Sequence, residues 1–221
     1  MTLGFRFVKN AGLVFSKPLS IILIALVLGH VSFTVYLLNE RHKKDATILE
    51  LEKRIADLEE KLKIFKIIED FQVGFNSEEV GRLTSVIHEE SKKYGYHPLL
   101  LLALIKTESS FRHGQESFMG ARGLLQLRPF VAHDVARRSK LEWTDKDLLF
   151  DSEFNIRVGS LYLFELILKF GDVKQAIVAY NQGEASLRLR MKYGNNIPEF
   201  FYQRFQDNYK ILKEKYEKLS V

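Results

Sequence analysis

The hydrophobic positions of this 221-residue chain follow three successive patterns. Residues 19–38 form a continuous apolar stretch, and residues 45–70 carry apolar side chains in a heptad repeat. From residue 75 to the end, apolar runs with helical spacing are separated by glycine, proline and serine. These patterns predict an all-α chain with an N-terminal tail (1–18), an apolar helix (19–38), a coiled coil (45–70) and a helical domain (75–221).

The first apolar stretch, LSIILIALVLGHVSFTVYLL, contains no formally charged side chain. At a rise of about 1.5 Å per residue, a helix over residues 19–38 spans roughly 30 Å, the thickness of a bilayer core. A cleaved signal peptide has a shorter apolar core and a small-x-small exit, whereas this stretch runs through Tyr36 and Leu38 into Asn39. A buried helix of a soluble protein is the other alternative. We expect an uncleaved transmembrane helix, which charge alone does not orient because basic residues flank both ends.

The heptad repeat consists of two sets of apolar residues, three positions apart: Ile48, Ile55 and Leu62, and Leu51, Leu58 and Phe65. Isoleucine at the first position with leucine at the second favours a parallel dimer. About three heptads are marginal on their own, so a helix that packs on the following domain is the alternative. We expect a membrane-proximal coiled-coil stalk that permits a homodimer.

Capping and breaking residues place the helices of the C-terminal part. Ser77, followed by Glu78 and Glu79, predicts one helix start, and Pro98 predicts another. Further helices are expected over residues 129–139, 154–170, 173–180 and 199–219.

Composition excludes several kinds of chemistry. The chain has no cysteine, so it has no disulfide, no thiolate nucleophile, no zinc–thiolate site and no lipid anchor on cysteine. The six histidines include no H-x-x-x-H pair, and we expect neither a metal nor another cofactor. The net charge is +5, but acids and bases alternate without a long Lys/Arg block, so nucleic acid is not an expected partner.

Glu108 is the main candidate for catalysis. It closely follows the apolar run Leu99–Ile105, where desolvation would raise the pKa of a carboxyl group toward neutrality. A carboxyl group that is protonated at working pH can act as a general acid. The glycine-rich segment 120–123 lets backbone approach a ligand, and Gln126 and the AYNQG segment (179–183) add amide and phenol groups suited to sugar hydroxyls. Each feature alone is common in proteins.

Together, these residues resemble the motifs of a known family. The segment from Glu108 to Gln126 is similar to the ES-x-F…S-x-x-GA-x-GLMQ motif of the lytic transglycosylase family, the goose-lysozyme-like SLT domain. NIRVGSLYL (155–163) resembles that family's N-I-x-x-G-x-x-YL helix, and AIVAYNQG resembles its AYNAG motif. The chain departs from the family pattern at four positions: His113, Gln115, Leu125 and Gln182.

The resemblance implies a lysozyme-like helical domain that cleaves the β-1,4 bond between N-acetylmuramic acid and N-acetylglucosamine in peptidoglycan. Glu108 would act as general acid and then as base, giving 1,6-anhydromuramyl ends. Ser117, Gln126, Tyr180 and Asn181 are candidates for positioning Glu108 or the acetamido groups of the substrate, with hydrogen bonds inside the domain as the alternative. The protein would then be a single-pass protein of the bacterial inner membrane with its catalytic domain in the periplasm.

Three alternatives remain open. A second carboxylate opposite Glu108 would make a goose-type hydrolase, and the acids that could supply it are Glu116, Asp134, Asp145, Asp151 and Glu184. A catalytically inactive peptidoglycan-binding scaffold is the second, and a purely structural coiled-coil membrane protein is the third. An anchored enzyme would cut wall close to the membrane, as envelope-spanning machinery requires when it passes through the wall.

Overall fold

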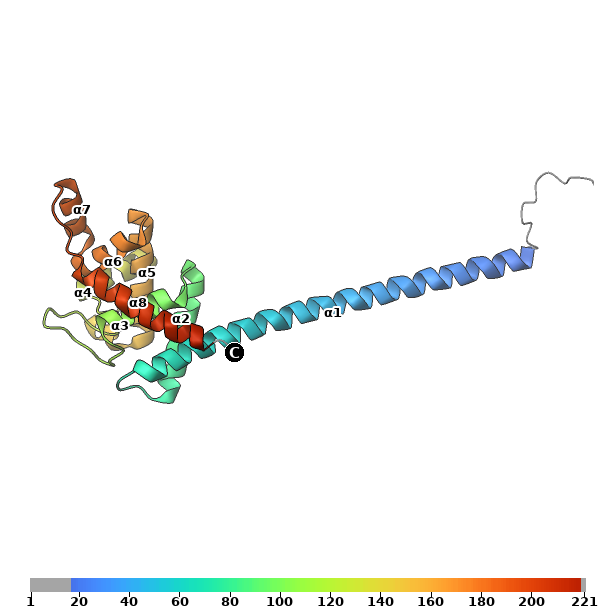
Figure 1. Cartoon of the computed structure of the whole chain (residues 1–221), viewed down its shortest axis with the longest axis horizontal. Helices are drawn as coiled ribbons and strands as arrows, with labels where there is room; N and C mark the ends of the chain where they lie inside the picture. The colour runs from blue at the N-terminus through green and yellow to red at the C-terminus, as the bar shows by residue number, and fades with distance from the viewer. Residues whose placement is uncertain (1–16, 220–221) are drawn as a thin grey trace, which may run out of the picture. The chain divides into compact units, whose positions relative to one another are not determined.

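The structure, a computed structural model, describes residues 17–219. The chain divides into two compact units, Met1–Ala56 and Asp57–Val221, and helix α1 (Lys17–Phe71) contributes to both (Figure 1). Residues 1–16 of the expected tail lie outside the described residues. Within residues 17–219, helices, turns and three isolated β-bridges account for the regular structure, and no strand forms. The all-α prediction is confirmed.

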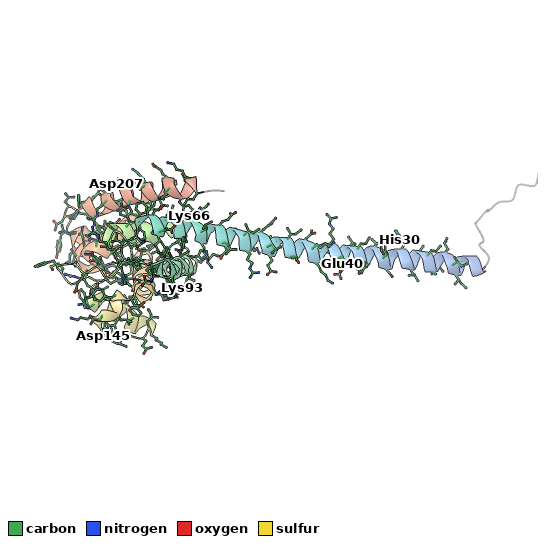
Figure 2. The ribbon with its side chains drawn as sticks, turned by 90° about the horizontal axis from the view of Figure 1, so that it is seen from below. His30, Glu40, Lys66, Lys93, Asp145 and Asp207 are labelled. Carbon is green, nitrogen blue, oxygen red and sulfur yellow. The ribbon has the colours of Figure 1, made fainter. Side chains whose placement is uncertain are left out.

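The first unit contains the apolar part of α1. Within the described residues, this helix is the one that is long and apolar enough to cross a membrane, and its most apolar window is 0% buried. Its large side chains between Ile21 and Leu38 are all at least half exposed. Figure 2 shows the side chains of this part around His30 and Glu40. By length and composition, the helix has the surface that a lipid environment requires.

The second unit begins inside the predicted coiled-coil stretch. Ile64, Ile67 and Ile68 of α1 are fully buried in its core, whereas Leu58 and Leu62 of the heptad seam remain 61% and 47% exposed. Residues 62 and 64 point about 200° apart around a helix, so domain packing leaves the seam open as far as Leu62. The last seam residue, Phe65, is half-buried and packs against the core. The coiled coil itself stays a prediction.

The N-cap of helix α2 (Ser77–Tyr94) lies one residue earlier than expected. Asn76, not Ser77, is the N-cap: its side chain accepts a hydrogen bond from the backbone N–H of Glu79, at 3.0 Å. The Glu79 carboxylate in turn accepts one from the Asn76 N–H, at 2.8 Å. This reciprocal pair satisfies two backbone N–H groups at the start of the helix, those of Asn76 and Glu79.

Helix α3 (Pro98–Glu108) lies at the centre of the second unit, and eight of its eleven residues are buried. Helix α8 (Phe200–Lys218) packs along it, and α2 packs against α5 (Ser152–Phe170). Helix α6 (Val173–Gln182) packs on α5, while α4 (Pro129–Ser139) and the short 3₁₀ helix η1 (Lys146–Phe150) complete that side. Helix α7 (Glu184–Lys192) and η1 were not expected from the sequence.

Candidate active site

Glu108 is the last residue of α3, at the end of the buried apolar run Leu99–Ile105. Burial raises the pKa of its carboxyl group to about 8, and the nearby Arg204 guanidinium opposes that rise. The carboxyl group makes no hydrogen bond or ion pair within the described part of the chain. Glu108 is therefore mostly protonated at neutral pH and free to donate its proton to a ligand.

The backbone turns sharply after Glu108. Ser110 and Phe111 both have positive φ angles, 53° and 58°, in the left-handed region that non-glycine residues rarely adopt. The Phe111 side chain is buried, with its ring 6.3 Å from that of Phe71, and its carbonyl oxygen accepts a hydrogen bond from the Val73 N–H at 3.1 Å. The core thus holds a strained turn in place, which fixes the direction of the chain beyond the carboxyl group.

Two side chains of α8 hold the end of α3. Arg204 donates a hydrogen bond to the Thr107 carbonyl oxygen at 2.9 Å, and the Asn208 amide donates one to the Thr107 hydroxyl at 3.0 Å. The carbonyl oxygens of the last helical turn have no partner within the helix, so the Arg204 contact satisfies one that would otherwise need water. They also place a positive charge near Glu108.

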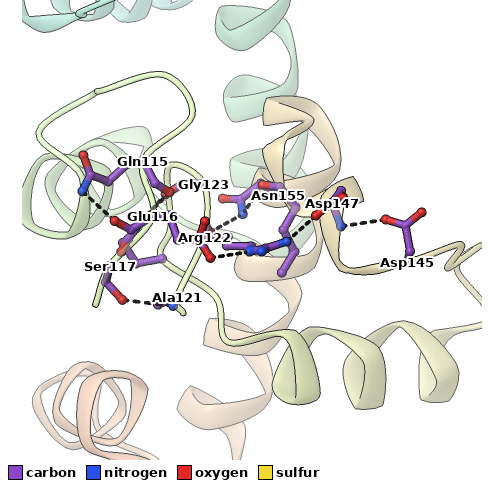
Figure 3. Close-up of polar contacts among 11 residues, drawn as sticks. Gln115, Glu116, Ser117, Ala121, Arg122, Gly123, Asp145, Asp147 and Asn155 are labelled. Atoms are coloured by element: carbon purple, nitrogen blue, oxygen red, sulfur yellow. Dashed lines mark hydrogen bonds and ion pairs between the residues drawn. The ribbon is translucent and has the colours of Figure 1, made fainter. Parts of the chain in front are cut away.

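The glycine-rich loop after α3 is built on a tight turn at Ser117 (Figure 3). The Gly120 N–H donates to the Ser117 carbonyl oxygen at 2.9 Å, and the Ala121 N–H donates to the Ser117 hydroxyl oxygen at 3.0 Å. The Ser117 hydroxyl, a predicted substrate contact, thus has a partner inside the loop. The turn leaves Phe118 fully exposed.

Asn155 of α5 holds the other end of this loop through hydrogen bonds to its backbone. Its buried amide donates to the carbonyl oxygens of Arg122 (2.9 Å) and Leu149 (3.1 Å) and accepts from the Leu125 N–H at 2.8 Å. Gly123 lies directly over this amide, because a Cβ atom there would lie 2.3 Å from Asn155 Nδ2. Asn155 belongs to the NIRVGSLYL segment, but its supporting role was not expected from the sequence.

Arg122 links the loop to η1 through two ion pairs. Its buried guanidinium donates from Nε to Glu116 at 2.9 Å and from Nη1 to Asp147 at 2.5 Å (Figure 3). It also lies 4.9 Å from the centre of the Phe150 ring. Two carboxylates compensate the buried charge. The sequence suggested that the GARG segment is close to a ligand, but it gave no sign of this ion-pair network.

The remaining candidates divide into internal and exposed groups. The Tyr180 hydroxyl donates to the Leu125 carbonyl oxygen at 2.9 Å, and burial, followed by the Glu108 charge, raises the pKa of Tyr180 well above its usual value. The Gln126 amide donates to the carbonyl oxygens of Gln115 and Gly123 at 3.1 and 2.9 Å. Asn181 is exposed at the end of α6, without a side-chain hydrogen bond to another described residue. Tyr180 is thus the candidate that the structure brings close to Glu108.

Every acid considered as a second carboxylate is engaged elsewhere. Glu116 pairs with Arg122, Asp134 with Arg137 and Arg138, and Glu184 with Lys169 and Arg188. Asp145 and Asp151 cap η1 and α5. Among the described residues, no group of three histidine or acidic side chains is placed to hold a metal ion. Each of these five carboxylates thus has a partner, whereas the Glu108 carboxyl group has none within the described residues.

Comparison with known families identifies the domain that carries this arrangement. The family model described as the transglycosylase SLT domain matches residues 85–199, which include α3, the glycine-rich loop and α6. The chain belongs to the transglycosylase SLT domain family. This match confirms the resemblance of the sequence motifs to that family and covers just over half of the chain.

Individual relatives match just under half of the chain. The "Membrane-bound lytic murein transglycosylase C" of Cronobacter sakazakii is 33% identical over 112 residues, 46% of this chain and 31% of the relative. The "Transglycosylase" of Enterobacteria phage PRD1 is 32% identical over 93 residues, 42% of this chain and 32% of the relative. The chain thus spans about a third of the length of these relatives.

Two solved lytic transglycosylases are also similar to part of this chain. Slt from Pseudomonas aeruginosa covers 60% of this chain with 22% of its own, at 24% identity and a TM-score of 0.47. The 70 kDa soluble lytic transglycosylase of Escherichia coli covers 61% of this chain with 23% of its own, at 20% identity and a TM-score of 0.48.

Proposed function

We propose that this protein is a membrane-anchored peptidoglycan lytic transglycosylase that cuts the bond between N-acetylmuramic acid and N-acetylglucosamine. The observation that carries the proposal is the state of Glu108, a lone carboxyl group whose pKa burial raises to about 8. Such a group can protonate a leaving oxygen at neutral pH. Family membership and the names of the relatives support glycan strands of the wall as the substrate.

The reaction begins when Glu108 donates its proton to the glycosidic oxygen. The bond from that oxygen to C1 of the muramyl residue breaks, and positive charge develops at C1. The Glu108 carboxylate then takes the proton from the muramyl 6-hydroxyl, whose oxygen forms the new bond to C1. The net change moves one proton from one sugar oxygen to another and closes a 1,6-anhydro ring without consuming water.

A hydrolase with two carboxylates is the competing mechanism. It would need a second acid that activates water or attacks C1 directly. The five acids considered for this role are held by arginine and lysine side chains or by helix N-termini. Their engagement favours the single-carboxylate route, in which the nearby Arg204 charge stabilises the carboxylate that forms after proton transfer.

The apolar part of α1 supports a membrane anchor, because it is exposed over the length of a bilayer core. Peptidoglycan lies outside the cytoplasm, so the catalytic domain would face the periplasm from the inner membrane. An enzyme held there cuts wall close to the membrane, where envelope-spanning machinery needs a passage.

The open heptad seam supports a homodimer. Leu51, Ile55 and Leu58 are each more than half exposed, although isoleucine and leucine at seam positions favour burial against a second helix. A dimer would place two catalytic domains on one stalk.

Mass spectrometry of digested peptidoglycan tests the proposed chemistry. The full chain is the right sample, because residues 57–71 supply Ile64, Ile67 and Ile68 to the core of the catalytic unit. Reconstituted in lipid nanodiscs, it should release fragments with 1,6-anhydromuramyl ends, and the Glu108→Gln variant should release none. Reducing ends would indicate a hydrolase, and binding without products would indicate a scaffold.

A further inference from the structure

A groove of about 590 Å³ lies on the second unit between the α2–α3 connection, α5, the start of α6 and one side of α8. Its volume falls within the range of roughly 300–1,000 Å³ that is typical of small-molecule sites. None of the predicted site residues lines it. Leu100 lines the groove, and it precedes Glu108 by eight residues of α3, or about 12 Å along the helix. Glu108 itself does not line the groove.

Two sets of aromatic rings line the groove. The first is Tyr94, Tyr96 and Phe164, in which the Tyr94 and Phe164 ring centres lie 4.8 Å apart. The second is Tyr202, Phe205 and Tyr209 of α8, with neighbouring ring centres 6.2 and 6.3 Å apart. Four of the six rings are tyrosines, so the surface combines flat apolar faces with hydroxyl groups.

The polar groups of the groove point to an acidic ligand. Lys210 is the one lysine among the lining residues, and no aspartate or glutamate lines the groove. Its ammonium group is exposed and forms no ion pair with another described residue. The Gln206 amide nitrogen donates to the Tyr202 hydroxyl at 3.1 Å, which leaves its carbonyl oxygen available as an acceptor.

We propose that this groove is a second peptidoglycan-binding site, which takes a muramyl disaccharide that carries a peptide carboxylate. The proposal rests on the proposed function, since it names a further contact with the same polymer. The C–H faces of pyranose rings fit the partly exposed rings of Tyr202 and Tyr209. The hydroxyl and acetamido groups fit Gln206 and the hydroxyls of these two tyrosines, since the Tyr96 hydroxyl already donates to the Ser160 carbonyl oxygen. The carboxylate fits Lys210.

A second site changes how the enzyme engages its polymer. A strand held at the groove raises the effective concentration of its neighbouring segments at Glu108, because the next binding step becomes intramolecular. A purely apolar ligand such as an acyl chain would leave the unpaired Lys210 ammonium without a function. The charge of the groove thus favours the acidic glycan.

A fluorescent reporter at the rim of the groove tests this proposal directly. The chain has no cysteine, so Val173→Cys, at a 42% exposed lining position, provides a unique thiol for an environment-sensitive dye. Leu168→Cys, at a 68% exposed position of α5 outside the groove, is the matched control. Both are made in the full-length Glu108→Gln chain in nanodiscs and titrated with GlcNAc-MurNAc-tripeptide.

We expect a saturable dye response at residue 173 and none at residue 168. Lys210→Gln should weaken apparent affinity about tenfold, as loss of one charge-assisted contact does, and Tyr209→Ala should weaken it similarly. Lys213→Gln, which changes a lysine outside the groove, should leave it unchanged. Uncharged di-N-acetylchitobiose should bind more weakly than the tripeptide ligand.

Three results would overturn the proposal: no response at residue 173, a response that survives both Lys210→Gln and Tyr209→Ala, or binding of uncharged di-N-acetylchitobiose that is as tight as binding of the tripeptide ligand. The products of peptidoglycan digestion are measured separately, with the chain that retains Glu108. Anhydromuramyl products without a groove response reject only the second site, whereas a groove response without products rejects only the catalytic proposal.

Discussion

The Arg204 guanidinium donates a hydrogen bond of 2.9 Å to the carbonyl oxygen of Thr107, which immediately precedes Glu108 although it lies 97 residues away from Arg204 in the chain. This contact brings a permanent positive charge near the buried carboxyl group. Burial raises the pKa of Glu108 and the arginine lowers it, and the balance stands at about 8. Helix α8 therefore contributes to the protonation state of the proposed acid.

The rate of glycan cleavage should fall as pH rises through about 8, because Glu108 loses the proton that the leaving oxygen needs. Release of soluble fragments by the full chain, measured as kcat/KM from pH 5 to 10, provides the profile. A rate that rises through pH 8 instead would show that the ionised carboxylate starts the reaction.

Replacing Arg204 should move the alkaline limb of the profile, the fall of kcat/KM above about pH 8, to higher pH. Arg204→Gln removes the charge that lowers the pKa of Glu108, so the carboxyl group should hold its proton to higher pH. We also expect a lower maximal rate, because the carboxylate formed after proton transfer loses a stabilising charge. Arg204→Lys is the matched control, since it keeps the charge and should keep the position of the limb. An unmoved limb in Arg204→Gln would mean that the contact with Thr107 is only structural.

Glu108→Gln should stabilise the domain in a pH-dependent way. The carboxyl group has a pKa of about 8 when folded and 4.5 as its reference value, so the folded state binds more protons than the unfolded state between these limits. The stability of the wild-type protein therefore falls as pH rises from about 4.5 to 8, and the variant lacks this loss. The difference in free energy of unfolding between the variant and the wild type should therefore be larger at pH 8.5 than at pH 4.5. We expect it to increase by at least about 1.4 kcal/mol, the equivalent of one pKa unit.

The single tryptophan, Trp143, supplies the measurement. It packs against the core and lies 6.1 Å from the ring of Phe154, so its fluorescence reports unfolding of the catalytic unit. A stability difference between the two proteins that does not change with pH would contradict the raised pKa.

The half-buried position of Glu108 could be predicted because the cause is local. The run Leu99–Ile105 is apolar on every side of the helix, and such a helix is buried wherever the domain forms. The Arg204 contact could not be predicted in this way, since it depends on how α8 packs along α3. Local pattern therefore identified the acid but not the charge that modulates it.

Similar reasons explain the other differences. Asn155 stands on an apolar helix face, and a polar residue there signals a buried hydrogen-bond network, but its partners in the 122–125 loop come from a distant segment. Helix α7 and the 3₁₀ helix η1 are short, so their side-chain patterns are too brief to separate from turns. At α2, Asn76 and Ser77 are both suitable caps, and the reciprocal contact with Glu79 decides between them.

Two glycines of the GARG segment should respond differently to alanine. Both have positive φ angles, 73° at Gly120 and 76° at Gly123, so both substitutions strain the backbone by about 1 kcal/mol. A Cβ at Gly120 meets nothing within 4 Å, whereas one at Gly123 lies 2.3 Å from the Asn155 amide and from the Leu149 carbonyl oxygen. Gly123→Ala should therefore cost about 3 kcal/mol in total and abolish cleavage. Equal losses in Trp143-monitored unfolding would show that the loop relaxes around the added atom.

The heptad seam should control the oligomeric state. Ile55 is 56% exposed at a seam position, and Ile55→Glu would place a charge where a dimer buries an apolar side chain. Ala56→Glu adds the same charge one residue along, at an exposed position outside the seam. In light scattering of the full chain in detergent, we expect a dimer for wild type and Ala56→Glu and a monomer for Ile55→Glu. Because residues 55 and 56 lie outside the catalytic core, both variants should keep the wild-type unfolding transition of Trp143. A wild-type monomer at micromolar concentration would rule out the stalk as a stable dimer and leave α1 as a single anchor for each catalytic domain.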